Sequence, residues 1–331
     1  MMRVFWDDRQ RLHAPSGEFF NGVMHDAAET RARVDAVLGA RIRAPRAPAD
    51  HGLNPIRRVH DAAYVEFLQV AHADWVAAGR DGDAFPYTFP VVGRRRKQWN
   101  RIDATIGHYS FDTSTPIGAG TWDAAYWSAQ TALSAVDAVL SGDAASFGIC
   151  RPPGHHAGSD YCGGYCYLNN AAIAAERAIE AGRKRVAILD VDYHHGNGTQ
   201  DIFAGREDVF FASVHADPMT DYPFYWGHAD ESARNVLNVP LPRGTDWIGY
   251  APALSKAVSW VQEKVPELLI VSFGADTHEA DPISHFKLKT DDYRRMAGRI
   301  ASFGVPTVVL LEGGYAVEAL GENVAAFLSD F

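Results

Sequence analysis

The sequence predicts an α/β protein built around a central, mainly parallel β-sheet. Apolar runs of strand length alternate along the chain with longer runs of helical periodicity, and reactive polar residues directly follow several of the apolar runs. No internal repeat or low-complexity linker interrupts the 331 residues, so one domain spanning 1–331 fits better than two. The strand candidates are 145–150, 186–189, 268–273 and 305–311, and the helix candidates are 122–140, 169–181, 247–264 and 291–303.

The strand candidate 186–189 is the most informative element, because it runs into the sequence DVDYHHGNG at 190–198. Side chains two residues apart in a strand face the same way, so Asp192 and His194 can point at one metal ion. They would do so from the carboxyl edge of the sheet, where open α/β sheets bind their ligands. The alternative is a polar turn without a function.

Two further strand candidates end in reactive residues. The run 268–273 is followed by GAD at 274–276, and the run 305–311 is followed by EGGY at 312–315. Asp276 can supply a third metal ligand, and two carboxylates with one imidazole leave a coordination position open, as catalytic zinc requires. Asp276 could instead cap the following turn, but its pairing with Asp192 and His194 favours the ligand role.

The strand candidate 145–150 leads into RPPGHHAG at 151–158. The double proline prevents a helix and stiffens the loop that carries His155 and His156. A metal-activated water that attacks an amide needs a base, and the departing amine needs an acid; histidine can serve as both near neutral pH. A second metal site or a surface loop are the alternatives.

Together these segments resemble the histone deacetylase superfamily and, within it, the bacterial acetylpolyamine amidohydrolases. The resemblance implies a three-layer arginase–deacetylase fold with a central, mainly parallel sheet. The matching segments occur in family order across nearly the whole chain: HDAAY at 60–64, RPPGHH at 151–156, GGYCYLNN at 163–170, DVDYHHGNG at 190–198, GAD at 274–276 and EGGY at 312–315.

The resemblance also implies a catalytic apparatus. His156 would be the general base and then the general acid. His155 would keep an electrostatic role and would be oriented by Asp190. Tyr315 would donate a hydrogen bond to the developing oxyanion, and the two glycines before it would let its side chain swing in. Asn197 would orient His156; because many members of the superfamily carry Asp there, Asn197 should raise the basicity of His156 less.

Two metal sites follow from the resemblance. Asp192, His194 and Asp276 would bind Zn²⁺, although this mixed set of ligands also suits Fe²⁺ in the cell. A structural monovalent cation, K⁺ by resemblance, would be bound by the side chains of Asp190 and Ser213. The backbone carbonyls of three residues would complete that second site: Asp192, His194 and Val214.

The segment from about 80 to 120 is the clue to the substrate. It contains prolines, glycines and aromatic residues with weak periodicity, and a stretch this long without strong secondary structure is usually functional. In the polyamine-deacetylating relatives a comparable insertion narrows the active-site mouth and forms a dimer contact. Asp103 or Asp112 could receive a distal ammonium group, with ordinary solvation as the alternative for both; Ser114 stands where those relatives carry an acidic residue that contacts substrate.

Aromatic walls are expected around the substrate. Tyr165, which follows Gly164, and Tyr222 match wall residues of the family, and two facing rings would hold a methylene chain and favour a cationic amine. Core packing is the alternative for both tyrosines.

Composition excludes several classes of protein. A net charge of −10 argues against nonspecific nucleic-acid binding, and the basic run at 94–97 is best explained as a solvated or interface loop. No apolar run approaches membrane-spanning length, and residues 1–8 indicate a short strand and not a signal peptide. The three cysteines, Cys150, Cys162 and Cys166, suggest packing residues in a reduced, cytoplasmic protein.

The function predicted from the sequence is therefore a zinc-dependent deacetylase of small acetylated amines. Acetylputrescine and acetylcadaverine are the favoured substrates, and the resemblance adds a homodimer. Three alternatives stay open: a protein acetyl-lysine deacetylase with a wider mouth, a ureohydrolase that shares the fold, and a catalytically silent sensor or scaffold.

Overall fold

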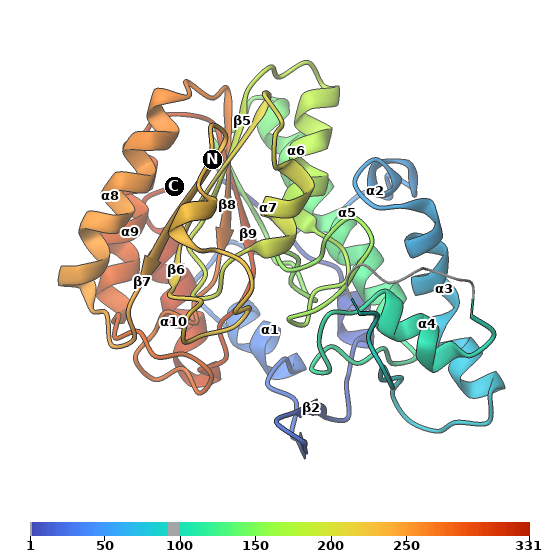
Figure 1. The fold of residues 1–331 in the computed structure, drawn as a ribbon. Helices are drawn as coiled ribbons and strands as arrows, with labels where there is room; N and C mark the ends of the chain where they lie inside the picture. Colours follow the sequence, from blue (N-terminus) through green and yellow to red (C-terminus); the bar gives the residue numbers. More distant parts are fainter. Residues whose placement is uncertain (1, 92–98) are drawn as a thin grey trace.

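A central parallel sheet organises the protein, which this computed structural model describes over residues 2–91 and 99–331. Within those residues seven strands follow the order β1-β4-β9-β8-β5-β6-β7, and every neighbouring pair is parallel (Figure 1). The strands are β1 (Arg3–Phe5), β4 (Ala145–Gly148), β5 (Val186–Asp190), β6 (Val209–Ala216), β7 (Val236–Leu241), β8 (Leu268–Phe273) and β9 (Thr307–Leu311). The predicted parallel sheet is confirmed.

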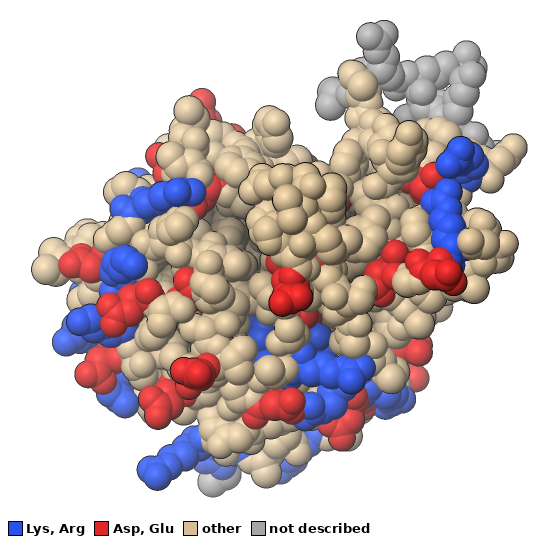
Figure 2. Space-filling model, turned by 90° about the horizontal axis from the view of Figure 1, so that it is seen from below, with Lys and Arg blue, Asp and Glu red and all other residues tan. Residues whose placement is uncertain are grey.

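A small antiparallel hairpin stands apart from this sheet. It consists of β2 (Glu18–Phe20) and β3 (Val23–His25), which are joined by a turn at Asn21 and Gly22 with φ angles of 51° and 78°. Positive φ at two successive residues is the geometry that an Asn-Gly pair adopts most readily in a two-residue hairpin turn. Figure 2 views the molecule from below Figure 1, the side on which β2 lies, and shows charges of both signs interspersed with uncharged residues.

Helices cover both faces of the sheet and complete the expected three layers. Two alternating sets of strand side chains contact them: Ile188 and Ile270 pack with α5 and α6, whereas Leu189 and Val271 pack with α8, α9 and α10. Strands buried on both faces are apolar on both, as parallel sheets require. The helices are α1 (Arg31–Leu38), α2 (Asn54–Arg57), α3 (Ala62–Ala77), α4 (Ile102–His108), α5 (Thr121–Leu140), α6 (Asn170–Glu180), α7 (Asn197–Phe203), α8 (Trp247–Glu263), α9 (Thr290–Ala301) and α10 (Val317–Leu328), with 3-10 helices η1 (Asp8–Leu12) and η2 (Ala229–Glu231).

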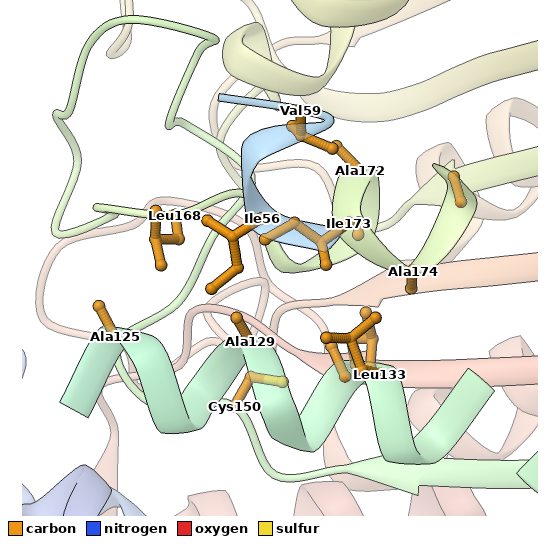
Figure 3. Close-up of a cluster of buried hydrophobic side chains, with 14 of the residues drawn as sticks. Ile56, Val59, Ala125, Ala129, Leu133, Cys150, Leu168, Ala172, Ile173 and Ala174 are labelled. Atoms are coloured by element: carbon orange, nitrogen blue, oxygen red, sulfur yellow. The ribbon is translucent and has the colours of Figure 1, made fainter. Parts of the chain in front are cut away.

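The layer formed by α5 and α6 shows how small residues bring the helices together. Ala129 and Leu133 of α5 lie opposite Ala172 and Ile173 of α6, and all four are fully buried (Figure 3). Alanine at the contact lets the two helix backbones approach closely while leucine and isoleucine fill the remaining space. Ser128 of α5 and Asn170 of α6 both donate hydrogen bonds to the carbonyl oxygen of Pro152, at 2.9 Å and 3.3 Å, and so anchor the loop that follows β4.

The segment from 80 to 120 contains more secondary structure than we expected. It includes α4, and Ala84 pairs with Ile117 in an antiparallel bridge. The basic run at 94–97 lies outside the described residues. The three cysteines are buried and free, as expected. Among the described helices, none combines the length and the apolar character that crossing a bilayer requires.

Candidate active site

The predicted reactive residues converge at one edge of the sheet. They follow β4, β9, β8 and β5, which are consecutive neighbours in the sheet. Because these strands are parallel, their carboxyl ends lie together, and the loops that leave them form one site. The convergence inferred from the sequence is therefore confirmed for the segments that follow these four strands.

Asp192, His194 and Asp276 form a candidate metal centre. Each offers a ligand atom, and these atoms lie within 4.8 Å of one another. His194 Nδ1 is 3.0 Å from Asp276 Oδ2 and 3.4 Å from Asp192 Oδ1. Both carboxylates are fully buried, so their negative charges must be compensated by protons or by a bound cation. The donor set of two carboxylates and one imidazole fits Zn²⁺ or Fe²⁺.

Two glycines leave room for this centre. A Cβ atom at Gly313 would lie 2.7 Å from a carboxylate oxygen of both Asp192 and Asp276, and one at Gly274 would lie 2.0 Å from Asp192 Oδ2. The Gly313 N–H donates to Asp192 Oδ2 at 2.8 Å. Close approach to the candidate metal ligands thus explains Gly313, whereas Gly314, directly before Tyr315, has a φ angle of +125° that favours glycine; the swing of Tyr315 stays a prediction.

Each of the two adjacent histidines has its own orienting partner. His155 Nδ1 donates to Asp190 Oδ2 at 2.9 Å, and His156 Nδ1 donates to Asn197 Oδ1 at 2.6 Å. The backbone N–H of His155 donates to Glu312 Oε2 at 3.1 Å, which holds the loop against the segment after β9. His156 lines the cavity described below, so its free Nε2 is the nitrogen available to a substrate.

The electrostatic environment shifts the pKa values of the two histidines in opposite directions. Burial and the charges of His155 and His194 hold the pKa of His156 well below its usual value. Burial also disfavours the charged form of His155, but Asp190 and Asp192 outweigh it and raise its pKa to about 10. In the metal-free site these shifts favour a neutral His156 and a protonated His155, and the catalytic roles of both residues stay predictions.

A cavity of about 390 Å³ opens onto this site. Tyr165, Tyr222 and Tyr315 line it together with His156 and His194, and the role of the first two as walls around a substrate stays a prediction. The rings of Tyr165 and Tyr315 meet edge to face at 5.6 Å, and the ring of Tyr222 lies 5.1 Å from that of His156.

Gly164 is required beside Tyr165. Its φ angle is +54°, and a Cβ atom there would lie 2.1 Å from the His156 ring. Any larger residue would displace His156, the candidate base. The absence of a side chain at Gly164 therefore leaves room for the His156 ring.

Neither aspartate that we expected to bind a distal ammonium group is free to do so. Asp103 is buried and pairs with Arg80 at 2.8 Å and Arg101 at 2.7 Å, beside a separate surface pocket that these arginines line. That prediction is wrong, because the charge of Asp103 is already compensated. Asp112 accepts hydrogen bonds from Gly164 N at 2.7 Å and Tyr222 Oη at 2.8 Å, so it positions the cavity wall.

Glu18 is an acidic cavity residue that the sequence analysis missed. It is 3% exposed, lines the cavity, and its Oε2 has no hydrogen-bond partner within the described part of the chain. Burial raises its pKa to about 7. The Asn-Gly pair at 21–22 could have revealed the hairpin that carries it, but no local pattern places that hairpin at the site.

The two side chains expected to bind a monovalent cation lie on neighbouring strands, and their role as its ligands stays a prediction. Asp190 and Ser213 are directly opposite partners on the neighbouring strands β5 and β6, and both are fully buried. Ser213 Oγ lies 2.8 Å from His215 Nδ1, which gives it a partner of its own.

Comparison with known proteins agrees with this geometry. The histone deacetylase domain family matches residues 25–331. Acetylpolyamine amidohydrolase 1 of Pseudomonas aeruginosa is 47% identical and aligns over 100% of this chain and 99% of its own length, and the acetylpolyamine amidohydrolase of Mycoplana ramosa is 43% identical over 99% and 98%. The crystal structure of acetylpolyamine aminohydrolase from Burkholderia pseudomallei superimposes with a TM-score of 0.94 at 37% identity, covering 100% of this chain and 98% of that one. The chain belongs to the histone deacetylase family.

Proposed function

We propose that this protein, as one deacetylase domain spanning 1–331, hydrolyses N-acetylated polyamines or diamines to acetate and free amine. Acetylputrescine and acetylcadaverine are the favoured substrates. One observation carries the proposal: the 390 Å³ cavity joins a candidate metal centre to aromatic walls and to the buried carboxylate of Glu18. The names of the full-length relatives support the same class of substrate.

The residues of the site divide the chemistry between them. Zn²⁺ held by Asp192, His194 and Asp276 would polarise the acetyl carbonyl and lower the pKa of a bound water. His156, neutral and oriented through Nδ1, accepts a proton at Nε2 and later delivers it to the departing amine. Tyr315 donates its hydroxyl proton in a hydrogen bond to the carbonyl oxygen as that oxygen gains negative charge.

The walls of the cavity select for a slender cationic chain. Tyr165 and Tyr222 present aromatic faces to a methylene chain and exclude water from it. Glu18 supplies a buried negative charge, which an ammonium group on that chain would compensate. A folded protein could offer this cavity only a single extended side chain.

A comparison of substrates tests the proposal. We expect kcat/KM of the zinc-loaded protein for acetylcadaverine or acetylputrescine to exceed that for an acetyl-lysine peptide by about 100-fold, or about 2.7 kcal/mol of transition-state discrimination. A preference for the peptide would instead assign the chain to protein deacetylation. No turnover of either substrate with zinc bound would point to a sensor or scaffold.

Replacing Glu18 by Gln should remove the preference for cationic substrates. A hydrogen bond to a charged group contributes about 1.5–3 kcal/mol, so we expect kcat/KM for acetylcadaverine to fall about 10- to 100-fold. N-acetylpentylamine, which has the same length but no ammonium group, is the matched control and should be affected little. Equal losses on both substrates would show that Glu18 only supports the wall.

The same carboxylate predicts a pH dependence. Burial raises the pKa of Glu18 to about 7, so its negative charge appears as the pH rises through that value. The ratio of kcat/KM for acetylcadaverine to that for N-acetylpentylamine should therefore increase from pH 6 to pH 8, because effects on His156 act on both substrates and cancel. Glu18→Gln should make the ratio flat over this range.

Three further features belong to the proposal. K⁺ would bind at Asp190 and Ser213 and at the backbone carbonyls near them. A homodimer would form through the segment 80–120, which exposes the apolar side chains of Tyr87 and Val91. A reducing, cytoplasmic environment would suit the three free cysteines. Size-exclusion chromatography with light scattering tests the dimer, and dialysis against Na⁺ or K⁺ followed by thermal melting tests the cation.

A further inference from the structure

Tyr315 is held in place by a carboxylate that belongs to a different loop. Asp281 lies between β8 and α9, is 7% exposed, and directs Oδ2 at the peptide groups around Tyr315. This oxygen accepts hydrogen bonds from Tyr315 N at 2.7 Å and from Ala316 N at 3.2 Å. The other oxygen, Oδ1, accepts a hydrogen bond from Ile283 N at 3.1 Å. Both oxygens of Asp281 therefore bind backbone N–H groups.

The other side of the same segment is fixed independently. Arg33 Nε donates to the carbonyl oxygen of Gly314 at 2.6 Å, and its guanidinium carbon lies 4.8 Å from the centre of the Tyr315 ring. Arg33 therefore binds the carbonyl that precedes Tyr315, whereas Asp281 binds the N–H groups of Tyr315 itself and of Ala316. The Gly314 carbonyl and the Tyr315 N–H belong to one planar peptide group, so Arg33 and Asp281 fix that group from its two ends.

We propose that Asp281 is a positioning residue: by fixing the backbone of Tyr315, it places the tyrosine hydroxyl where the oxyanion forms. The proposal rests on the amide hydrolysis proposed above. A tyrosine side chain is long and rigid, so a small rotation at its backbone moves its hydroxyl by a much larger amount. Misplacement of a catalytic group by about 1 Å can lower the rate about 10²-fold.

The position of Asp281 in its own loop strengthens this inference. The segment 276–284 begins at the candidate metal ligand Asp276, and its residues Pro282 and Ile283 line the cavity. Ser284 Oγ donates to the carbonyl oxygen of Asp276 and closes the segment. Asp281 thus ties Tyr315 to the same loop that carries a metal ligand and part of the substrate wall.

A purely structural role must be distinguished, because Asp281 also binds N–H groups just before α10. The chain offers a matched control in Asp292, a similarly buried carboxylate whose Oδ2 accepts a hydrogen bond from Lys289 N at 2.9 Å at the start of α9. Asn replaces one carboxylate oxygen by an NH₂ donor, so each variant loses one of two acceptors. Both oxygens of Asp281 bind backbone N–H groups, whereas those of Asp292 bind Lys289 N and Arg295 Nη1. Asp292 lies outside the residues that line the cavity.

The kinetic test combines these variants with Tyr315→Phe. We expect Asp281→Asn to lower kcat for acetylcadaverine about 10- to 100-fold with little change in KM, and Asp292→Asn to leave both unchanged. In the Tyr315→Phe background, Asp281→Asn should lower kcat less than about threefold, because residues that act through one group are not additive. Equal losses in both backgrounds, or an equal loss in Asp292→Asn, would overturn the proposal.

Inhibitor binding gives a second readout that needs no turnover, so it holds even if the proposed substrate is wrong. The hydrate of a trifluoromethyl ketone analogue mimics the tetrahedral intermediate and would accept a hydrogen bond from Tyr315, whereas an alkyl thiol of the same length would contact the metal alone. Asp281→Asn and Asp281→Ala should weaken the ketone about 10-fold or more and leave the thiol unchanged. Asp281 would have a structural role only if both inhibitors were weakened equally. The same conclusion would follow if both Asp281 variants failed to fold while Asp292→Asn folded.

Discussion

Replacing Tyr315 by Phe is expected to lower kcat by about 10²- to 10³-fold and to leave KM nearly unchanged, as the loss of one oxyanion donor does in other hydrolases. The hydroxyl contributes only when the carbonyl oxygen becomes negative, so its loss raises the barrier without weakening substrate binding. Phe keeps the ring that packs edge to face on Tyr165 at 5.6 Å, so the cavity should keep its shape. Steady-state kinetics with acetylcadaverine measure the effect.

Tyr250→Phe is the matched control for this experiment. Tyr250 is fully buried, its hydroxyl has no hydrogen-bond partner in the described residues, and it is not among the residues that line the cavity. Its replacement should leave kcat within about twofold. A small effect of Tyr315→Phe, with unchanged metal content, would remove Tyr315 from the mechanism.

Removal of the metal, by chelation or by Asp192→Asn, is expected to abolish turnover. Asp192 and Asp276 are fully buried, and Asn at 192 takes away one of the two negative charges that attract the cation. Metal content measured by plasma emission should fall from about one ion per chain to well below one. Full activity in a demonstrably metal-free sample would contradict the assignment of the centre.

Metal affinity should also increase with pH. Without a metal, burial and Asp192 raise the pKa of Asp276 to about 8; burial opposes the charged form of His194, but Asp192 and Asp276 raise its pKa to about 10. Protons therefore occupy this centre at pH 7 and must leave when a cation binds. Between pH 6 and pH 8 we expect the apparent affinity to rise at least about tenfold per pH unit, measured by competition with a chelator of known affinity.

The sequence was sufficient to predict the residues that follow strands. Asp192, His194, Asp276 and Tyr315 each come within a few positions of a buried apolar run, and the carboxyl ends of parallel strands meet at one edge. Local pattern and sheet geometry together therefore determined which side chains would be neighbours. The search for apolar runs did not find β6 and β7, because polar residues interrupt their apolar sequences. In β7 Pro240 interrupts the run as well, which is tolerated because β7 is an edge strand.

The substrate end of the site was less predictable, because it depends on contacts between distant loops. Asp103 is neutralised by Arg80 and Arg101, and no spacing rule indicates which loop acids will be paired in this way. Glu18 and Asp281 are likewise ordinary residues of short loops or hairpins. They acquire roles only because the fold brings residues 18, 281 and 315 to one edge of the sheet.

The position of β9 has a consequence for how the protein is made. This strand is synthesised after every other strand of the sheet, yet it lies between β4 and β8 in the middle of the sheet. While the chain is still growing on the ribosome, β1 and β4 cannot join the strands on the other side of the gap that β9 fills. Assembly of the complete sheet must therefore wait until β9 has been synthesised, and nascent chains would depend on protection from aggregation until then.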